Sequence, residues 1–191
     1  MHNMDAAAMK KRLARILVER SYMEGDFTLA SGKKSDYYFD CRQTSLHPEG
    51  AWLIGSLFNE MLRDLDVKAV GGMTMGADPL ISATSVRSHE LGRPLAGLIV
   101  RKAAKDHGTA RVIEGLANVT AGDSVAMLED VVSTGGSVLQ ACERIRDAGL
   151  NVAVICCVLD RGEGGREKLL EAGYAVRAIF TRPELVTLAR E

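Results

Sequence analysis

The stretch Val125-Ala-Met-Leu-Glu-Asp-Val-Val-Ser-Thr-Gly-Gly-Ser137 joins a predicted strand to a predicted helix. Its first four residues are apolar, which is typical of a short strand buried on both faces. Apolar residues at helical spacing come after it, at Val138, Cys142 and Ile145. The segment between them is therefore a loop at the carboxyl end of a strand, the edge at which open α/β sheets bind their ligands.

The loop itself combines hydroxyl groups and glycines with two carboxylates. A helix N-terminus with free N–H groups, beside hydroxyl donors and glycines that allow close backbone approach, is typical of a phosphate site. The residues that offer these groups are Ser133, Thr134, Gly135, Gly136 and Ser137. Glu129 and Asp130 would repel a phosphate, so ribose hydroxyls or a magnesium ion suit them better. The sequence contains neither GxxxxGK[ST] nor GxGxxG, and an ordinary strand–loop–helix connection with an acidic N-cap is the alternative.

Length and composition favour one globular domain, residues 1–191. The 24 Lys and Arg residues nearly cancel the 25 Asp and Glu residues, so we expect no nucleic-acid partner. Four cysteines without a CxxC pair, three of them in apolar stretches, favour small core residues in a reducing compartment. No apolar run approaches the ~20 residues that span a bilayer, and the N-terminus lacks a signal-peptide apolar region. We therefore expect a cytoplasmic protein without a membrane segment, with a transit peptide over residues 1–20 as the alternative.

The rest of the chain alternates strand and helix patterns. We predict helices over 6–20, 48–62, 79–91, the segment after Ser137 and 166–172, and a final helical turn after Pro183. We predict strands over 67–70, 95–100, 123–128, 152–159 and 175–180, and a hairpin within 26–42 whose turn is centred on 31–33. This alternation indicates an α/β fold with a central parallel sheet and helices on both faces.

Two further segments follow predicted strand ends. The glycine-rich segment 71–78 either brings backbone amides to a diphosphate or only permits tight helix-on-sheet packing. Segment 101–111 carries five potentially cationic side chains, which on charge alone is typical of a solvated surface. Its position after a strand favours a cationic loop that closes over a leaving diphosphate.

Arg161 and the hairpin aromatic residues are the remaining candidates. Arg161 follows the strand 152–159, where it suits bidentate binding of a carboxylate; a salt bridge with Glu163 or Asp160 is the alternative. Tyr38 and Phe39 suit either the strand core or a platform for a ligand ring.

Taken together, the hairpin 27–40, the loop Arg101-Lys-Ala-Ala-Lys-Asp-His-Gly108, the 129–137 motif and Asp160-Arg161 resemble orotate phosphoribosyltransferases of the type I phosphoribosyltransferase family. The resemblance covers nearly the whole chain. It implies the type I fold, with residues 1–45 forming a small N-terminal hood that includes the hairpin. It also implies transfer of phosphoribose from phosphoribosyl diphosphate (PRPP) to orotate, with Mg²⁺ as cofactor, as a step of pyrimidine biosynthesis.

The resemblance implies the following site residues. PRPP binding is expected at Arg101, Lys102, Lys105, His107, Glu129, Asp130, Val131, Val132, Ser133, Thr134, Gly135, Gly136 and Ser137. Orotate binding is expected at Ser133, Arg161, Tyr38 and Phe39, and catalytic roles at Lys102, Lys105, Asp106 and His107. No side chain is assigned as a direct metal ligand, because Mg²⁺ is expected to be bound mainly through PRPP. A homodimer is also implied, in which loop 101–111 is shared across the interface and Lys102 acts in trans.

The sequence departs from the family pattern at a few positions. Ala30 stands where some members have a lysine, Ser133 replaces the commoner threonine, and no Tyr-Lys pair is evident between Gly72 and Asp78. The 129–137 motif is shared with phosphoribosyltransferases for other bases, so the first alternative is a phosphoribosyltransferase for a purine or another base. Arg161 favours an acidic base and argues against this alternative. A non-catalytic PRPP-sensing regulator is the second alternative.

Overall fold

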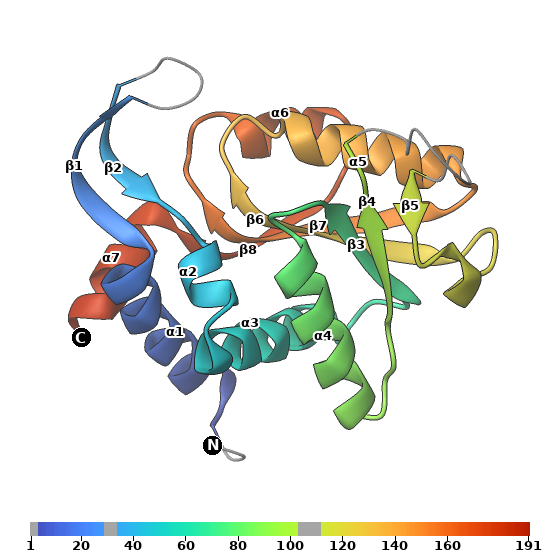
Figure 1. Ribbon diagram of the computed structural model, residues 1–191, viewed down its shortest axis with the longest axis horizontal. Helices are drawn as coiled ribbons and strands as arrows, with labels where there is room; N and C mark the ends of the chain where they lie inside the picture. The colour runs from blue at the N-terminus through green and yellow to red at the C-terminus, as the bar shows by residue number, and fades with distance from the viewer. Residues whose placement is uncertain (1–3, 29–33, 103–111) are drawn as a thin grey trace.

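The computed structural model describes residues 4–28, 34–102 and 112–191. A six-stranded sheet lies between two layers of helices, and a separate antiparallel hairpin stands at one side (Figure 1). The strands are β1 (Tyr22–Thr28), β2 (Lys34–Phe39), β3 (Ala69–Met73), β4 (Ala96–Val100), β5 (Ile113–Glu114), β6 (Ser124–Val132), β7 (Asn151–Asp160) and β8 (Val176–Thr181). The helices are α1 (Ala6–Arg20), α2 (Arg42–Ser45), α3 (Pro48–Met61), α4 (Asp78–Glu90), the 3₁₀ turn η1 (Leu116–Asn118), α5 (Gly136–Asp147), α6 (Gly165–Glu171) and α7 (Arg182–Arg190).

The sheet has the order β5-β4-β3-β6-β7-β8. All neighbouring pairs are parallel except β4 with β5 at the edge. The strand order reverses direction between β3 and β6, so a crevice forms beyond their carboxyl ends. The predicted parallel sheet is thus confirmed, with one antiparallel edge strand that was not predicted.

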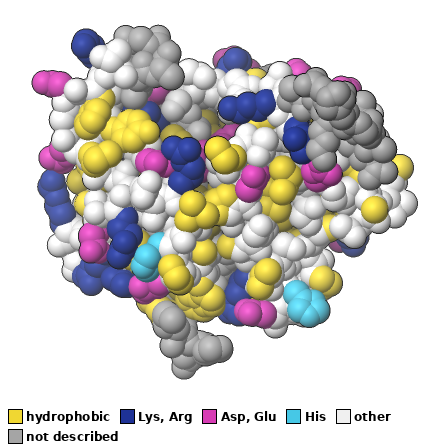
Figure 2. All heavy atoms as spheres, in the orientation of Figure 1, with side chains coloured by type: hydrophobic (Ala, Val, Ile, Leu, Met, Phe, Trp, Pro, Cys, Tyr) yellow, Lys and Arg dark blue, Asp and Glu magenta, His cyan; other side chains and the backbone are white. Residues whose placement is uncertain are grey.

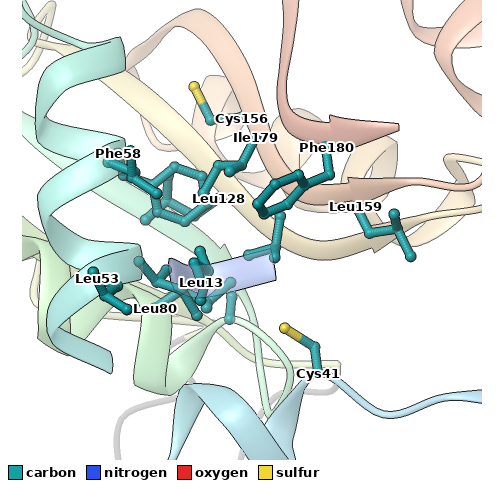
Figure 3. Packing of buried hydrophobic residues seen from close by; sticks show 14 of the residues in the cluster. Leu13, Cys41, Leu53, Phe58, Leu80, Leu128, Cys156, Leu159, Ile179 and Phe180 are labelled. Carbon is teal, nitrogen blue, oxygen red and sulfur yellow. The ribbon is translucent and has the colours of Figure 1, made fainter. Parts of the chain in front are cut away.

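Alternate residues of β6 bury themselves on opposite faces of the sheet. Ala126 and Leu128 pack with α1, α3, α4 and α7, whereas Val125 and Met127 pack with α5 and α6. Figure 3 shows part of the first of these cores, which includes Phe58 of α3, Leu128 of β6 and Phe180 of β8. Burial on both faces explains why residues 125–128 of β6 are all apolar.

Most predicted elements agree with the structure within a few residues, and the differences concern charged or short segments. β6 continues through Glu129 and Asp130 to Val132, so the prediction that the strand ends at Leu128 is wrong. The final element α7 is a nine-residue helix rather than a turn, closed at its N-terminus by a capping box between Thr181 and Glu184. Neither α2 nor β5 was predicted, because each is too short to show a periodic pattern.

The predicted hairpin is confirmed, with β1 antiparallel to β2, while its predicted turn at 31–33 lies outside the described residues. The four cysteines are buried free thiols, and burial raises the pKa of Cys142 and Cys156 to about 12. Within the part of the chain that the structure describes, no helix is both long and apolar enough to cross a membrane.

Candidate active site

A cleft of about 380 Å³ opens where β3, β6 and β7 end, with β2 of the hairpin forming one wall. It brings together residues that are far apart in the sequence. The predicted site residues that line it are Tyr38, Phe39, Lys102, Glu129, Asp130, Val131, Ser133, Ser137 and Arg161. The cleft therefore unites the carboxylates, the hydroxyl loop, one lysine and the arginine.

Glu129 and Asp130 form the acidic wall of the cleft. Glu129 is buried, and its Oε2 accepts a hydrogen bond from Ser137 Oγ at 3.1 Å. Burial, followed by the neighbouring charge of Asp130, raises the pKa of Glu129 to about 8. Asp130 lies against Gly76, where an added Cβ would be 3.0 Å from its Oδ2. A protonated Glu129 can donate a hydrogen bond, and the carboxyl oxygens of both residues can accept hydrogen bonds, which matches a pair of sugar hydroxyls.

The hydroxyl loop leads from β6 into the N-terminus of α5. Gly135 adopts the left-handed conformation with φ of 73°, which an L side chain rarely tolerates, and α5 begins at Gly136. Among the described residues no side chain caps this helix, so its first-turn N–H groups are available for an anion. Thr134, Gly135 and Gly136 surround this N-terminus, although they do not line the cleft itself.

Val132 differs from its predicted neighbours because its side chain is buried in the core. Its carbonyl oxygen accepts a hydrogen bond from the Arg161 amide at 3.0 Å. Any contribution of Val132 to ligand binding would therefore come from its backbone alone.

For the glycine-rich segment 71–78, the structure supports the close-packing alternative at Gly72. A Cβ at Gly72 would lie 2.4 Å from both the Ala77 Cβ and the Leu128 carbonyl oxygen, so only glycine fits there. Thr74 and Met75 nevertheless line the cleft, which keeps the segment at the edge of the site.

The cationic segment leaves β4 at the rim of the cleft. The Arg144 guanidinium of α5 donates to the carbonyl oxygens of Arg101 and Lys102, which fixes the root of the segment. Lys102 lines the cleft, whereas Arg101 forms an ion pair with Glu114 of β5 at 3.1 Å. The predicted residues Lys105, Asp106 and His107 lie outside the described residues.

Arg161 is the cation at the opposite end of the cleft, directly after β7. Only 8% of its side chain is exposed, and its Nε lies 3.0 Å from Glu163 Oε1. The alternative ion pair with Glu163 is thus present in the structure, in addition to the position of Arg161 in the cleft wall. Asp160 instead accepts a hydrogen bond from the Gly162 amide at 2.9 Å.

Comparison with known proteins decides the family. No protein-family model matches the chain. The orotate phosphoribosyltransferase of Sorangium cellulosum (strain So ce56) is 45% identical over 181 residues, which cover 94% of this chain and 94% of the relative. The chain belongs to the orotate phosphoribosyltransferase family. The crystal structure of the Mycobacterium tuberculosis H37Rv orotate phosphoribosyltransferase with Fe(III) dicitrate is 36% identical, has a TM-score of 0.80 and covers 93% of this chain and 98% of that one. Its complex with PRPP, aligned at 32% identity over 93% of this chain and 99% of that one, has a TM-score of 0.78.

In this member of the family, the hairpin contains a residue near the cleft that the sequence prediction overlooked. On β2, Tyr37 and Phe39 are buried while Tyr38 is 37% exposed, because alternate residues of a strand face opposite sides. The prediction paired Tyr38 with Phe39 and passed over Tyr37, although the period-two pattern would have placed Tyr37 with Phe39. The Tyr37 hydroxyl accepts a hydrogen bond from Arg161 Nε at 2.8 Å.

Asp40 and Arg42 also line the cleft and were not predicted. They form an ion pair of 2.8 Å, and the Arg42 guanidinium lowers the pKa of Asp40 below its usual range. Nothing in the sequence distinguishes them from an ordinary surface pair.

Proposed function

We propose that this chain transfers the phosphoribosyl group of PRPP to orotate, giving orotidine 5′-monophosphate and diphosphate in pyrimidine biosynthesis. The observation that carries the proposal is the 45% identity with an orotate phosphoribosyltransferase, together with a cleft that joins the 129–137 motif to Arg161. In the reaction the bond between ribose C1 and the diphosphate oxygen breaks, and a ring nitrogen of orotate bonds to C1.

The acidic wall and the hydroxyl loop would hold the ribose phosphate. Glu129 and Asp130 bind the ribose hydroxyls through their carboxyl oxygens, which also stabilise the positive charge that develops on the sugar at the transition state. The 5-phosphate binds in the loop from Val131 to Ser137, where free N–H groups and hydroxyls converge on the N-terminus of α5. The buried position of Glu129 and its bond to Ser137 support this arrangement, because they fix the two halves of the motif relative to each other.

The opposite end of the cleft would bind orotate. Arg161 pairs with the orotate carboxylate, Ser133 contacts the base, and Tyr38 and Phe39 flank the pyrimidine ring. A guanidinium with little solvent exposure favours an anionic base over adenine or hypoxanthine, since the carboxylate of such a base can form a second ion pair with Arg161 beside the one with Glu163.

The cationic segment would stabilise the leaving diphosphate. Arg101, Lys102, Lys105 and His107 supply positive charge where negative charge develops, and Asp106 orders the segment. Lys102 is the member of this group that lines the cleft in the described residues.

We infer that Mg²⁺ enters with PRPP rather than in a site built by the protein alone. The described residues contain no cluster of three or more potential metal ligands among His, Cys, Asp and Glu. The cleft still offers the Asp130 carboxylate, which fits the usual binding of Mg²⁺ through one or two carboxylates and substrate phosphates. When bound, the ion neutralises charge on the diphosphate.

We also propose that the protein is a homodimer with loop 101–111 shared across the interface. A hollow of about 610 Å³ over α3 and α4 is lined mainly by apolar groups, and Figure 2 shows hydrophobic side chains exposed over α2, α3 and α4. Leu46 is 72% exposed and Val86 65%, which favours a face covered by a second copy. Met75, 68% exposed, lies at the edge of the cleft, so a partner on this face would stand next to the site.

In the structure Lys102 lies at the cleft of its own chain, whereas a shared loop would bring it to the partner's cleft. Mixing two inactive variants distinguishes these arrangements. If Lys102 acts in trans, a mixture of Lys102→Ala and Arg161→Gln regains roughly a quarter of wild-type activity, since half of the random dimers are mixed and each has one intact site. If Lys102 acts within its own chain, the mixture stays inactive. Sedimentation velocity of each variant confirms that dimers form.

The activity itself is tested by the loss of orotate absorbance. We expect this loss to require both PRPP and Mg²⁺ and to yield orotidine 5′-monophosphate and diphosphate in equal amounts. Binding of PRPP without turnover of any base would favour the regulator instead.

A further inference from the structure

The orientation of Arg161 depends on a tyrosine from the hairpin. Its Nε donates to the Tyr37 hydroxyl at 2.8 Å, and its guanidinium carbon lies 4.6 Å from the centre of the Tyr37 ring. Glu163 pairs with the charge at 3.0 Å from the same Nε. The Nε side of the guanidinium is therefore committed to protein groups.

Tyr37 is in turn held from several directions. Its ring stacks on Tyr22 with 5.1 Å between ring centres, and the Arg182 guanidinium lies 4.0 Å from its centre. Arg182 is fixed by an ion pair with Asp36 at 2.8 Å. Ser35 Oγ donates to the Tyr37 carbonyl oxygen at 2.7 Å. The Tyr37 hydroxyl, which accepts the hydrogen bond from Arg161, is thus held in place where β2, the end of β7 and α7 meet.

These contacts leave the edge of the Arg161 guanidinium that is formed by Nη1 and Nη2 available for a ligand. Arg161 Nη2 reaches only Ser35 Oγ, at 3.4 Å, and Nη1 donates to no group among the described residues. Because Nε is occupied, a carboxylate can bind in bidentate fashion through the two Nη groups. The Tyr37 hydroxyl orients the arginine without adding a second negative charge to that of Glu163, and burial raises the pKa of Tyr37, which keeps the hydroxyl neutral.

We propose that Tyr37 is a positioning residue for base recognition, which acts through Arg161 by turning its Nη edge toward the carboxylate of the incoming base. This inference rests on the proposed function, in which that base is orotate. It adds a residue that does not need to touch the substrate, and it makes the base site depend on the packing of the hairpin against Arg161.

The substitution Tyr37→Phe removes the hydroxyl and keeps the ring that packs against Tyr22 and Arg182. We expect the KM for orotate to rise about tenfold, since a hydrogen bond to a charged group is lost, while the KM for PRPP changes by less than about twofold. The matched control is Tyr174→Phe, which removes a tyrosine hydroxyl next to Arg146 of α5, away from the cleft. In the control both KM values should stay at the wild-type level.

A double-mutant cycle separates positioning from general destabilisation. In an Arg161→Gln background, Tyr37→Phe should change the KM for orotate by less than about twofold, because the residue through which it acts is gone. An equal rise of the orotate KM in both backgrounds would overturn the proposal, as would an unchanged orotate KM in the single variant. Failure of the wild-type protein to convert orotate would instead overturn the proposed function, so the two failures are distinguishable.

Discussion

Gly165 offers a way to displace the phosphate loop without changing any residue in it. A Cβ at Gly165 would lie 2.5 Å from the Ser133 carbonyl oxygen and 2.9 Å from the Val132 Cγ1. Since ordinary contacts begin at 3.4 Å, the Gly165→Ala variant must move the Ser133 peptide by about 0.9 Å or shift α6 by a similar amount. We expect a loss of about 1–3 kcal/mol in the free energy of unfolding, as for other overpacked sites.

Gly165→Ala should lower the activity of the folded protein as well as its stability. Misplacement of a binding group by roughly 1 Å can cost about 10²-fold, so we expect kcat/KM for PRPP to fall by about 10–10²-fold. The melting temperature should fall by about 2–12 °C, at about 2–4 °C per kcal/mol for a chain of this size. Steady-state kinetics at varied PRPP and a thermal melt measure the two effects on one preparation.

Gly164→Ala is the matched control. Gly164 has φ of 87° and no atom within 4 Å of an added Cβ, so this variant costs about 1–2 kcal/mol in backbone strain without pressing on Ser133. It should lose stability and keep its kcat/KM for PRPP. If Gly165→Ala is destabilised but retains wild-type kcat/KM for PRPP, the Ser133 peptide does not form part of the phosphate site.

Three further predictions concern charged groups. Because burial raises the pKa of Glu129 to about 8, the stability that its protonated form contributes is complete below pH of about 4.5 and is lost as the pH rises toward 8. Urea unfolding should therefore show that Glu129→Gln gains stability relative to wild type between pH 5.5 and 8, and a constant difference would contradict the raised pKa. Arg144→Ala frees the carbonyl groups of Arg101 and Lys102, so kcat should fall by about tenfold, with the KM for orotate unchanged. Lys102→Ala should lower the steady-state rate by about 10²–10³-fold, as for the loss of one electrostatic donor elsewhere, and a near-wild-type rate would remove this lysine from the mechanism.

The sequence was sufficient for those parts of the fold that depend on periodic apolar residues. Helix α1 agrees with its prediction because Met9, Leu13, Ile16 and Leu17 recur at helical spacing. The end of β6 could not be predicted in the same way, since Glu129 is a charged residue type that the fold buries. The hydrogen bond from Ser137 and the protonation that follows from the raised pKa both lower the free-energy cost of burying Glu129. Both arise only from the tertiary structure.

The candidate site shows the same division. The 129–137 motif is local, so its strand, loop and helix N-terminus follow from neighbouring residues. The contact between Arg161 and Tyr37 joins residues 124 positions apart, and no local pattern specifies it. Strand alternation on β2 would have shown that Tyr37 faces inward, but only the packed hairpin shows that it meets Arg161.

A competition among bases tests the central proposal most directly. The protein is supplied with limiting PRPP, Mg²⁺ and an equimolar mixture of orotate, uracil, adenine and hypoxanthine, and the nucleotide products are separated by chromatography and identified by mass. Orotidine 5′-monophosphate should be the nucleotide formed, because orotate is the base in this mixture that has a carboxylate to pair with the Arg161 guanidinium. Formation of a purine nucleotide or of uridine 5′-monophosphate, or the absence of any nucleotide product, would contradict it.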